Sequence, residues 1–440
     1  MTREVYLQRL RRALAGKVSG EELERTVRYY AACLDEAGPE GEEALMAEWG
    51  EPEELAERLR AAAGHRRPGR WARAGIAAGL GAVLVLSAVL GLRHLGGSGV
   101  RRVETASEDS VAGAFTLEDP FSAVDIEVDV GNVTLIQSGT DYACDLSWSG
   151  EDYTLEARVE DGTLVVQGNR SGGIHLTAED ISAWIEITVP EGTDLTGLEA
   201  YTGLGDVALT GGENGLSTGH LDVTADMGDV TLSGLRAEET VLTLDMGELS
   251  ADRCALGRWT GSNAMGGMSF SGVTAEETAL TLDMGELTAV DCAWGDTDVD
   301  SAGGNVTLTR LEAGTLDCML DLGGLELTEV TAGPVDLEVA MGGVTAEDCT
   351  LSEGTVTCDG GDVDLAGALT GTWNAENSMG SVRVSTSAPR ESWGWDLSSD
   401  LGGVWVDGRT QSTQDHAEGG PNFLTARTDL GEVELNFTNS

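Results

Sequence analysis

Pairs of carboxylates three residues apart recur along the second half of the chain. Asp226 with Asp229 and Asp245 with Glu248 are two such pairs, and each pair brackets a glycine. If the pairs stack on one another in the fold, their oxygens form the kind of cluster that attracts Ca²⁺. From residue 245 onwards, however, the first position alternates between Asp and Ala, which keeps like charges apart. We therefore favour a solvated acidic face, with weak Ca²⁺ sites at these four residues as the alternative.

Paired carboxylates also serve as the acid and base of glycoside hydrolysis. No His, Lys or Arg recurs beside the acidic pairs, and the single lysine, Lys17, lies near the N-terminus. The repeats hardly vary in length, which leaves few loops to build a cleft. The sequence predicts a protein that is not an enzyme, with no catalytic residue and no cofactor. A polysaccharide-active enzyme is the minor alternative.

Sulfur-containing residues occupy fixed positions of their own. Met246 and Met265 belong to a set of methionines that directly precede recurring glycines, and thioethers suit Cu(I). The alternation of apolar residues places this set inward, and Leu322 takes the same position, so we expect the methionines to pack in the core. Cys254 and Cys292 fall in another inward column, too far apart for a disulfide, which predicts buried free thiols.

One aromatic residue departs from the pattern of its column. Trp405 takes a repeat position otherwise filled by Thr, Ser or charged residues, all of which we expect to face outward. An outward Trp near the end of a rod can stack on a sugar ring or contact a partner, so it is our candidate ligand contact. The favoured alternative is that residues 408–427 fold over it as a cap.

A 19-residue repeat positions all of these residues. Apolar residues alternate with polar ones in short runs, and two-residue interruptions between the runs indicate corners. Three short strands per turn, stacked turn on turn, make an all-β, three-sided β-solenoid with 19-residue coils. We place a β-rich leading segment at 115–200, and solenoid repeats with a C-terminal cap at 201–440. The repeat is marked by nine glycines at 19-residue intervals: Gly228, Gly247, Gly266, Gly285, Gly304, Gly323, Gly342, Gly361 and Gly380.

Residues 74–92 form an uncharged and mostly apolar run. As a helix it would be about 28 Å long, close to the hydrocarbon thickness of a bilayer, so we expect one transmembrane helix between linkers at 63–73 and 93–114. The preceding linker is the more basic of the two, which puts the N-terminus in the cytoplasm and the C-terminal part outside the cell membrane. Gly75 and Gly79 form a GxxxG pair, one of the ways in which two spans pack, and a homodimer is one alternative.

Residues 1–62 have the pattern of a small all-α domain. Ser19 and Glu22 form a capping box at the start of an amphipathic helix, and Pro52 stands where a first helical turn begins. A segment of this size buries only a small core, which favours a docking or signalling module over an enzyme.

Two parts of the chain resemble known bacterial families. The run EWGEPEELA at 48–56 is similar to the HAAS family, whose members are helical cytoplasmic signalling domains on membrane proteins, associated with helix-turn-helix regulators and often found beside a PadR-type regulator. GNVTL at 131–135, ITVPEG at 187–192 and the recurring M-G-[DE]-[VL] resemble a family of proposed adhesins. That resemblance covers about 115–440 and implies a β-solenoid of unknown function on a membrane anchor.

Charge separates the two halves of the protein. The chain has 26 basic and 76 acidic residues, of which 14 of each lie in 1–95, leaving 12 basic and 62 acidic residues beyond. A surface this acidic repels nucleic acid, which excludes direct nucleic-acid binding. We expect a single-pass envelope protein whose acidic solenoid binds or senses an envelope component, such as a glycan, and whose head relays to a cytoplasmic regulator. The alternative is a surface adhesin or structural rod for which the head is only an anchor.

Overall fold

The chain divides into two compact units, residues 1–96 and 97–440. The predicted transmembrane helix at 74–92, with Gly75 and Gly79, lies outside the residues that the structure describes, as does most of the predicted helical head. Within the described residues, no helix has the length and apolar character that crossing a membrane requires. The computed structural model describes residues 113–149, 153–170 and 182–438, together with Tyr6, Arg9, Arg11, Arg12 and Pro52.

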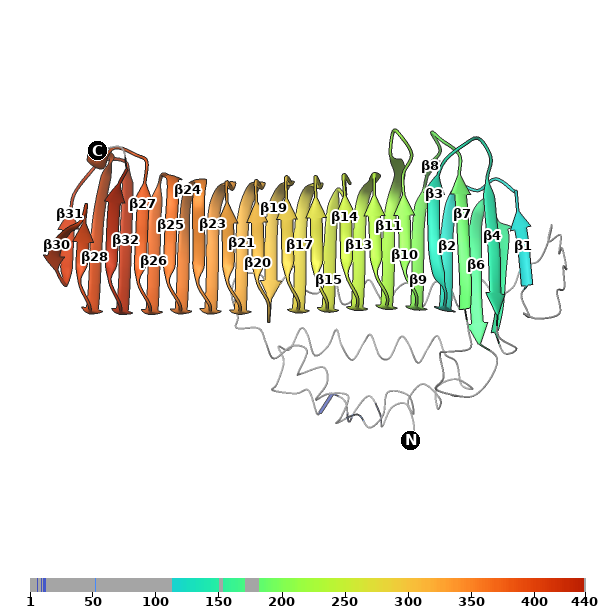
Figure 1. Ribbon diagram of the computed structural model, residues 1–440, viewed down its shortest axis with the longest axis horizontal. Helices are drawn as coiled ribbons and strands as arrows, with labels where there is room; N and C mark the ends of the chain where they lie inside the picture. Colours follow the sequence, from blue (N-terminus) through green and yellow to red (C-terminus); the bar gives the residue numbers. More distant parts are fainter. Residues whose placement is uncertain are drawn as a thin grey trace. The chain divides into compact units, whose positions relative to one another are not determined.

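The second unit is a β-solenoid, as the 19-residue repeat predicts, with its strands stacked in successive coils. Figure 1 shows its strands following one another in a row from β1 to β31. One coil consists of a short strand, β12 (Val230–Ser233), and a long strand, β13 (Leu235–Met246). The long strand bends where Glu238 and Glu239, two successive residues, are both exposed. The bend divides it into two sides, so the coil has three.

Short strands stack on one side of the solenoid in a parallel ladder. Val230 pairs with Leu249 and Leu249 with Met268, each 19 residues further along the chain. In spatial order the short strands are β3 (Asn132–Gln137), β10 (Val207–Thr210), β12, β14 (Leu249–Asp252), β16 (Met268–Ser271), β18 (Leu287–Val290), β20 (Val306–Thr309), β22 (Leu325–Thr328), the start of β24 (Val344–Gly360), β25 (Val363–Leu369), β27 (Val382–Thr386), β33 (Val433–Phe437) and β29 (Val404–Val406).

Long strands form the other two sides in the same manner, and pair in the same register. Their spatial order is β2 (Ala123–Val130), β9 (Gly197–Leu204), β11 (Leu216–Met227), β13, β15 (Arg258–Met265), β17 (Thr274–Met284), β19 (Ala293–Ser301), β21 (Glu312–Leu322), β23 (Thr331–Met341), the end of β24, β26 (Thr372–Met379), β32 (Asn422–Leu430) and β28 (Trp393–Leu401).

The recurring glycines allow neighbouring coils to approach closely at the corner between a long strand and the next short one. Gly266 has a φ of +139°, a conformation that residues with a side chain rarely adopt. A Cβ atom at this position would also collide with the carbonyl oxygen of Gly247 in the neighbouring coil. Both conformation and space therefore require glycine here.

Inward side chains of the described strands fill the interior of the solenoid. Leu242 and Leu244 are almost fully buried, and Trp259, Phe270 and Trp294 contact one another edge to face. Among the described residues, the core cluster runs from Leu117 to Phe437. The solenoid is thus a folding unit with a core of its own.

Antiparallel strands cover the N-terminal end of the stack. β7 (Ser182–Val189) pairs with β3, β4 (Ala143–Ser149) pairs antiparallel with β7, and β1 (Gly113–Leu117) pairs antiparallel with β4. On the long-strand side, a hairpin of β5 (Tyr153–Glu160) and β6 (Thr163–Arg170) pairs with β2 through β6. The two-residue β8 (Asp194–Leu195) pairs with β11. The predicted leading segment is therefore both the first coil and its cover.

Chain order and spatial order differ at the C-terminal end. β32 pairs with β26 on one side and β28 on the other, so the last coil of the sequence lies between two coils that precede it (Figure 1). A short 3₁₀ helix, η2 (Arg390–Ser392), leads into β28. In the sequence between β29 and β32, the chain forms two further strands, β30 (Arg409–Ser412) and β31 (Gln414–Ala417). β30 pairs antiparallel with β29, and β31 pairs antiparallel with β28.

Candidate functional site

A line of exposed methionine and leucine side chains runs along the glycine corner of the solenoid. Each ends a long strand, and Met227, Met246 and Met265 are successive partners in the parallel ladder. Glycine takes the same position in two later coils, at Gly303 and Gly360. Their exposed fractions range from 38% at Met246 to 70% at Leu401. We call this line the apolar ladder; its members are Met227, Met246, Met265, Met284, Leu322, Met341, Met379, Leu430 and Leu401.

This arrangement corrects the prediction that the methionines fill the core. Leu244 is 1% exposed, but Asp245 and Met246 after it are both exposed. The alternation of the strand ends at Leu244 because the chain already turns into the corner, and the turn directs the last residue outward. Sequence periodicity places the corner at the glycine, whereas the structure begins it two residues earlier.

Acidic residues border the apolar ladder on both sides. One column directly precedes the ladder residues in sequence, and the other directly follows the corner glycines. No described coil has a basic residue in either column. The first column holds Asp226, Asp245, Asp283, Asp321, Asp429 and Asp400, with Asp359 in the same position before Gly360, and the second holds Asp206, Asp229, Glu248, Glu286, Asp362 and Glu432.

Some of these acidic residues accept hydrogen bonds that link the corners of neighbouring coils. The Oδ1 atom of Asp229 accepts a hydrogen bond from the backbone N–H of Glu248 at 2.8 Å, and Asp362 does the same for Ser381. Asp226 accepts a hydrogen bond from the hydroxyl of Tyr201. Within the described ranges, no group of three or more His, Cys, Asp or Glu residues is arranged to hold a metal ion.

Weak Ca²⁺ binding at Asp226, Asp229, Asp245 and Glu248 stays a prediction. The structure adds a role for Asp229 that a spacing argument does not reveal, because its partner is a backbone group of the next coil. The sequence signal for that role is the recurrence of Asp, Asn or Ser directly after a corner glycine.

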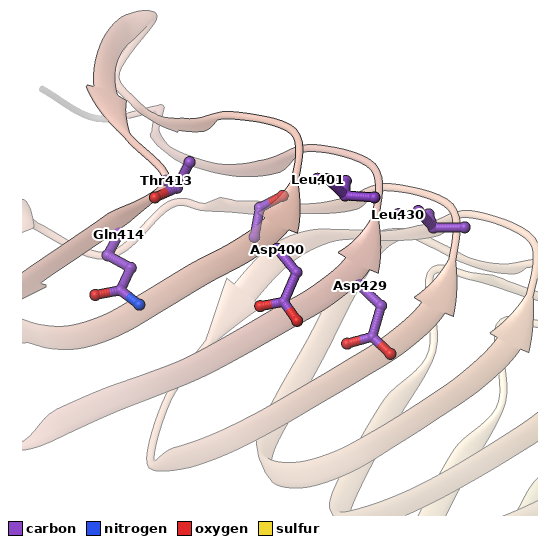
Figure 2. A pocket seen from close by; sticks show the side chains of 7 residues that line it. Asp400, Leu401, Thr413, Gln414, Asp429 and Leu430 are labelled. Carbon is purple, nitrogen blue, oxygen red and sulfur yellow. The ribbon is translucent and has the colours of Figure 1, made fainter.

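The apolar ladder ends in a hollow of about 570 Å³ at the C-terminal end of the solenoid. Figure 2 shows Leu401 and Leu430 along the corner, with the carboxylates of Asp400 and Asp429 extending side by side from adjacent strands. Arg427 lies 3.3 Å from an oxygen of Asp400 and 3.4 Å from one of Asp429. Ser399, Thr413 and Gln414 complete the lining. The hollow thus has an apolar margin and two carboxylates.

A second acidic group lies on the flat outer face of the long strands. Asp298, Asp317 and Asp336 are register partners in three neighbouring coils. Partial burial raises the pKa of Asp298 to about 6, with Asp300 adding to the effect. Burial also raises the pKa of Asp317 to about 6, followed in importance by repulsion from Asp298 and Asp336. Sequence analysis missed this group because stacking, not spacing within one coil, brings the three carboxylates together.

Trp405 lies at the outermost coil, where its strand β29 pairs antiparallel with β30. Trp405 is only half-buried, and its partner in that pairing is Thr410. Residues 408–427 thus contribute strands beside it, as the cap alternative expects. Its role as a ligand contact remains a prediction. The cysteines predicted as buried thiols, among them Cys254, Cys292 and Cys349, are buried and free.

Two parts of the sequence match known protein families. Residues 121–293 and 276–422 match the family described as Toastrack DUF4097, and together they cover more than half of the chain. The chain belongs to the DUF4097 toastrack family. Residues 6–58 match the HAAS family, so this toastrack protein carries a HAAS domain at its N-terminus. The HAAS resemblance of the N-terminal part is thereby confirmed, and the family expected at 115–440 is the toastrack β-solenoid family.

Solved structures similar to the toastrack solenoid include two proposed adhesion proteins. One, from Clostridium sporogenes, is 10% identical with a TM-score of 0.16, and the match covers 74% of this chain and all of the other. A proposed adhesin from Bacteroides fragilis is 12% identical with a TM-score of 0.18, covering 77% and 100%. A proposed lipid-binding protein from Parabacteroides distasonis is 10% identical with a TM-score of 0.22, covering 74% and 96%.

These scores are too low to carry an argument about fold or function. No curated protein matches the chain.

Proposed function

We propose that this toastrack protein is a non-enzymatic, single-pass protein of a bacterial envelope. In this proposal the solenoid binds an envelope component outside the cell membrane, and the HAAS head relays the bound state to a cytoplasmic regulator such as one of the PadR type. The exposed apolar ladder carries the proposal. Contiguous apolar side chains on the surface of a soluble unit mark an interaction site, and here they follow one corner through many coils.

A relay requires the outside ligand to favour one packing state of the span over another, because equal affinity for both states shifts nothing. Gly75 and Gly79 are the residues we propose for that packing. An adhesin needs only an anchor, whereas this chain has a recognisable HAAS domain at 6–58. The presence of that domain is why we place the relay before adhesion.

Deleting residues 1–62 tests the relay. We expect the solenoid to remain on the cell surface while transcription of a small set of envelope genes changes, measured by RNA sequencing under envelope stress. Replacing Gly75 and Gly79 with Leu should affect the same genes, and replacing Ala77 and Ala78 with Leu is the matched control on the same span. Identical transcripts in the deletion and the wild type, with cell attachment lost only when the solenoid is removed, would instead establish an adhesin.

Protease accessibility tests the proposed location. Protease added to spheroplasts should remove residues beyond about 100 and leave residues 1–62 protected, because the basic residues lie mainly before the run 74–92. Antibodies against each end of the chain follow the two parts. Protection of the solenoid and loss of the head would reverse the proposed orientation.

A further inference from the structure

We propose that the apolar ladder is a docking site for a cationic amphipathic helix. The inference rests on the proposed function in one respect only, that the solenoid binds a partner, and it names the chemistry of that partner. Three observations carry it: the spacing of the ladder, its acidic borders and the dominance of methionine.

The spacing of the ladder suits one face of a helix. Neighbouring coils are about 4.8 Å apart, and a helix rises about 5.4 Å per turn. A helix lying along the corner therefore presents roughly one apolar side chain per turn to each ladder residue over several turns. From Met227 to Met284 the line is unbroken through four coils, because Met227, Met246, Met265 and Met284 are successive partners.

The acidic borders specify the charge of the partner. Carboxylates stand on both sides of Met227, Met246 and Met284, three of the four residues of the unbroken line. No basic residue stands in either column among the described coils. An anionic lipid surface would be repelled by these columns, and so would a second copy of a chain with a net charge of −50. A helix with Lys or Arg on both flanks of an apolar stripe instead matches the ladder and both columns together.

Methionine suits a surface that accepts helices of differing sequence. Its unbranched and flexible side chain adapts its shape to a partner, and exposed methionines are overused at such binding surfaces. Met265 and Met284 are 44% and 59% exposed in the absence of a partner.

The experiment uses residues 97–440, since this unit has a core of its own, and a fluorescein-labelled peptide of about 21 residues with Leu and Lys at helical spacing. Fluorescence anisotropy measures Kd. Met246→Gln with Met265→Gln should weaken binding about tenfold or more, because both exposed apolar contacts are lost. Met319→Gln is the matched control: Met319 is 46% exposed but lies outside the ladder, and the change should leave Kd within about twofold.

Charge and pattern are tested separately. Asp245→Asn with Glu248→Gln should also weaken binding and reduce its dependence on salt. A peptide with Glu in place of Lys should not bind, and one with the same composition but scattered leucines should bind at least about tenfold more weakly.

Equal binding by the Met246→Gln, Met265→Gln variant and the wild type would overturn the proposal, as would equal binding of the scattered peptide. So would self-association of residues 97–440 in sedimentation that this variant abolishes, because the ladder would then join two copies. None of these results depends on transcription, so the docking proposal can fail while the relay stands, and the reverse.

Discussion

At the scale of single residues, two adjacent glycines have very different requirements. Gly266 has a positive φ and no room for a Cβ atom, whereas at Gly267 the nearest atom to a Cβ would be a carbonyl oxygen at 3.4 Å. Gly266→Ala should lower the free energy of unfolding by about 2 kcal/mol or more, and Gly267→Ala by less than about 0.5 kcal/mol. Urea denaturation of residues 97–440 measures both. Similar losses of stability in the two variants would show that the backbone conformation of the corner is not what requires glycine at position 266.

Two aspartates give the solenoid a pH dependence of predictable sign. The pKa of Asp298 and of Asp317 is about 6, above the ordinary value of 3.8, so the folded state favours their protonated forms. Their contribution to stability is therefore greatest below about pH 4, falls as the pH rises to about 6, and stays low above that. Asp298→Asn with Asp317→Asn should raise stability at pH 7.5 by about 1 kcal/mol after screening by solvent.

Thermal unfolding at constant ionic strength, from pH 4.5 to 7.5, measures this effect. The double variant should show a smaller fall in Tm over that range than the wild type. Asp283→Asn with Asp321→Asn, at two exposed positions beside the apolar ladder, is the control for lowering net charge alone. If the control reduces the fall of Tm with pH as much as the test variant does, general repulsion between carboxylates is the cause.

The limits of sequence analysis at this scale have a common physical origin. The inward or outward direction of a side chain follows from alternation inside a strand, and the buried pair Val306 and Leu308, two residues apart, obeys it. Alternation fails at a corner, which is why Met246 does not. The carboxylate group around Asp317 forms only when coils stack, so no single repeat contains it.

At the scale of the strand, β20 offers a direct test of inward and outward directions. Val306 is fully buried, and Thr307, the next residue, lies on the outer face. Val306→Asp should cost about 3 kcal/mol or more, because it buries a charge without a partner. Thr307→Asp should cost less than about 1 kcal/mol, most of it from repulsion by Glu326 opposite. Chemical denaturation of the two variants in parallel measures the difference.

The order of the coils shows what a repeat pattern can and cannot predict. The 19-residue period predicts that residues one repeat apart stack, and β12 to β22 do so. Gly402 and Gly431 follow the same glycine pattern, yet Gly431 lies next to Gly380 and Gly402 lies beyond it. The sequence between them differs in length from a repeat, and only pairing in space determines where such a segment returns.

At the scale of the whole molecule, net charge governs the response to cations. With 62 acidic and 12 basic residues beyond residue 95, the solenoid repels itself at low salt, so added salt should raise its Tm. We expect millimolar Ca²⁺ to do no more than NaCl of matched ionic strength, because Asp226 and Asp229 already accept hydrogen bonds within the fold. Differential scanning calorimetry measures both effects. A specific gain from Ca²⁺ that disappears in Asp245→Asn with Glu248→Gln would establish the Ca²⁺ sites.

The insertion of β32 and β33 between two earlier coils also affects folding during synthesis and the recognition of incomplete chains by proteases. The outermost coil, β28 with β29, has no neighbour to stack on until the final strands arrive, since its parallel partners are β32 and β33. The coil of β28 and β29 therefore stays without a parallel neighbour until β32 and β33 have been translated. A chain that stops short of Asn422 leaves the backbone N–H and C=O groups of β26 and β27 unpaired, and such edges attract proteases and other unfolded chains. The strands β32 and β33 thus act as a quality-control mark that separates chains with a paired C-terminal edge from chains without one.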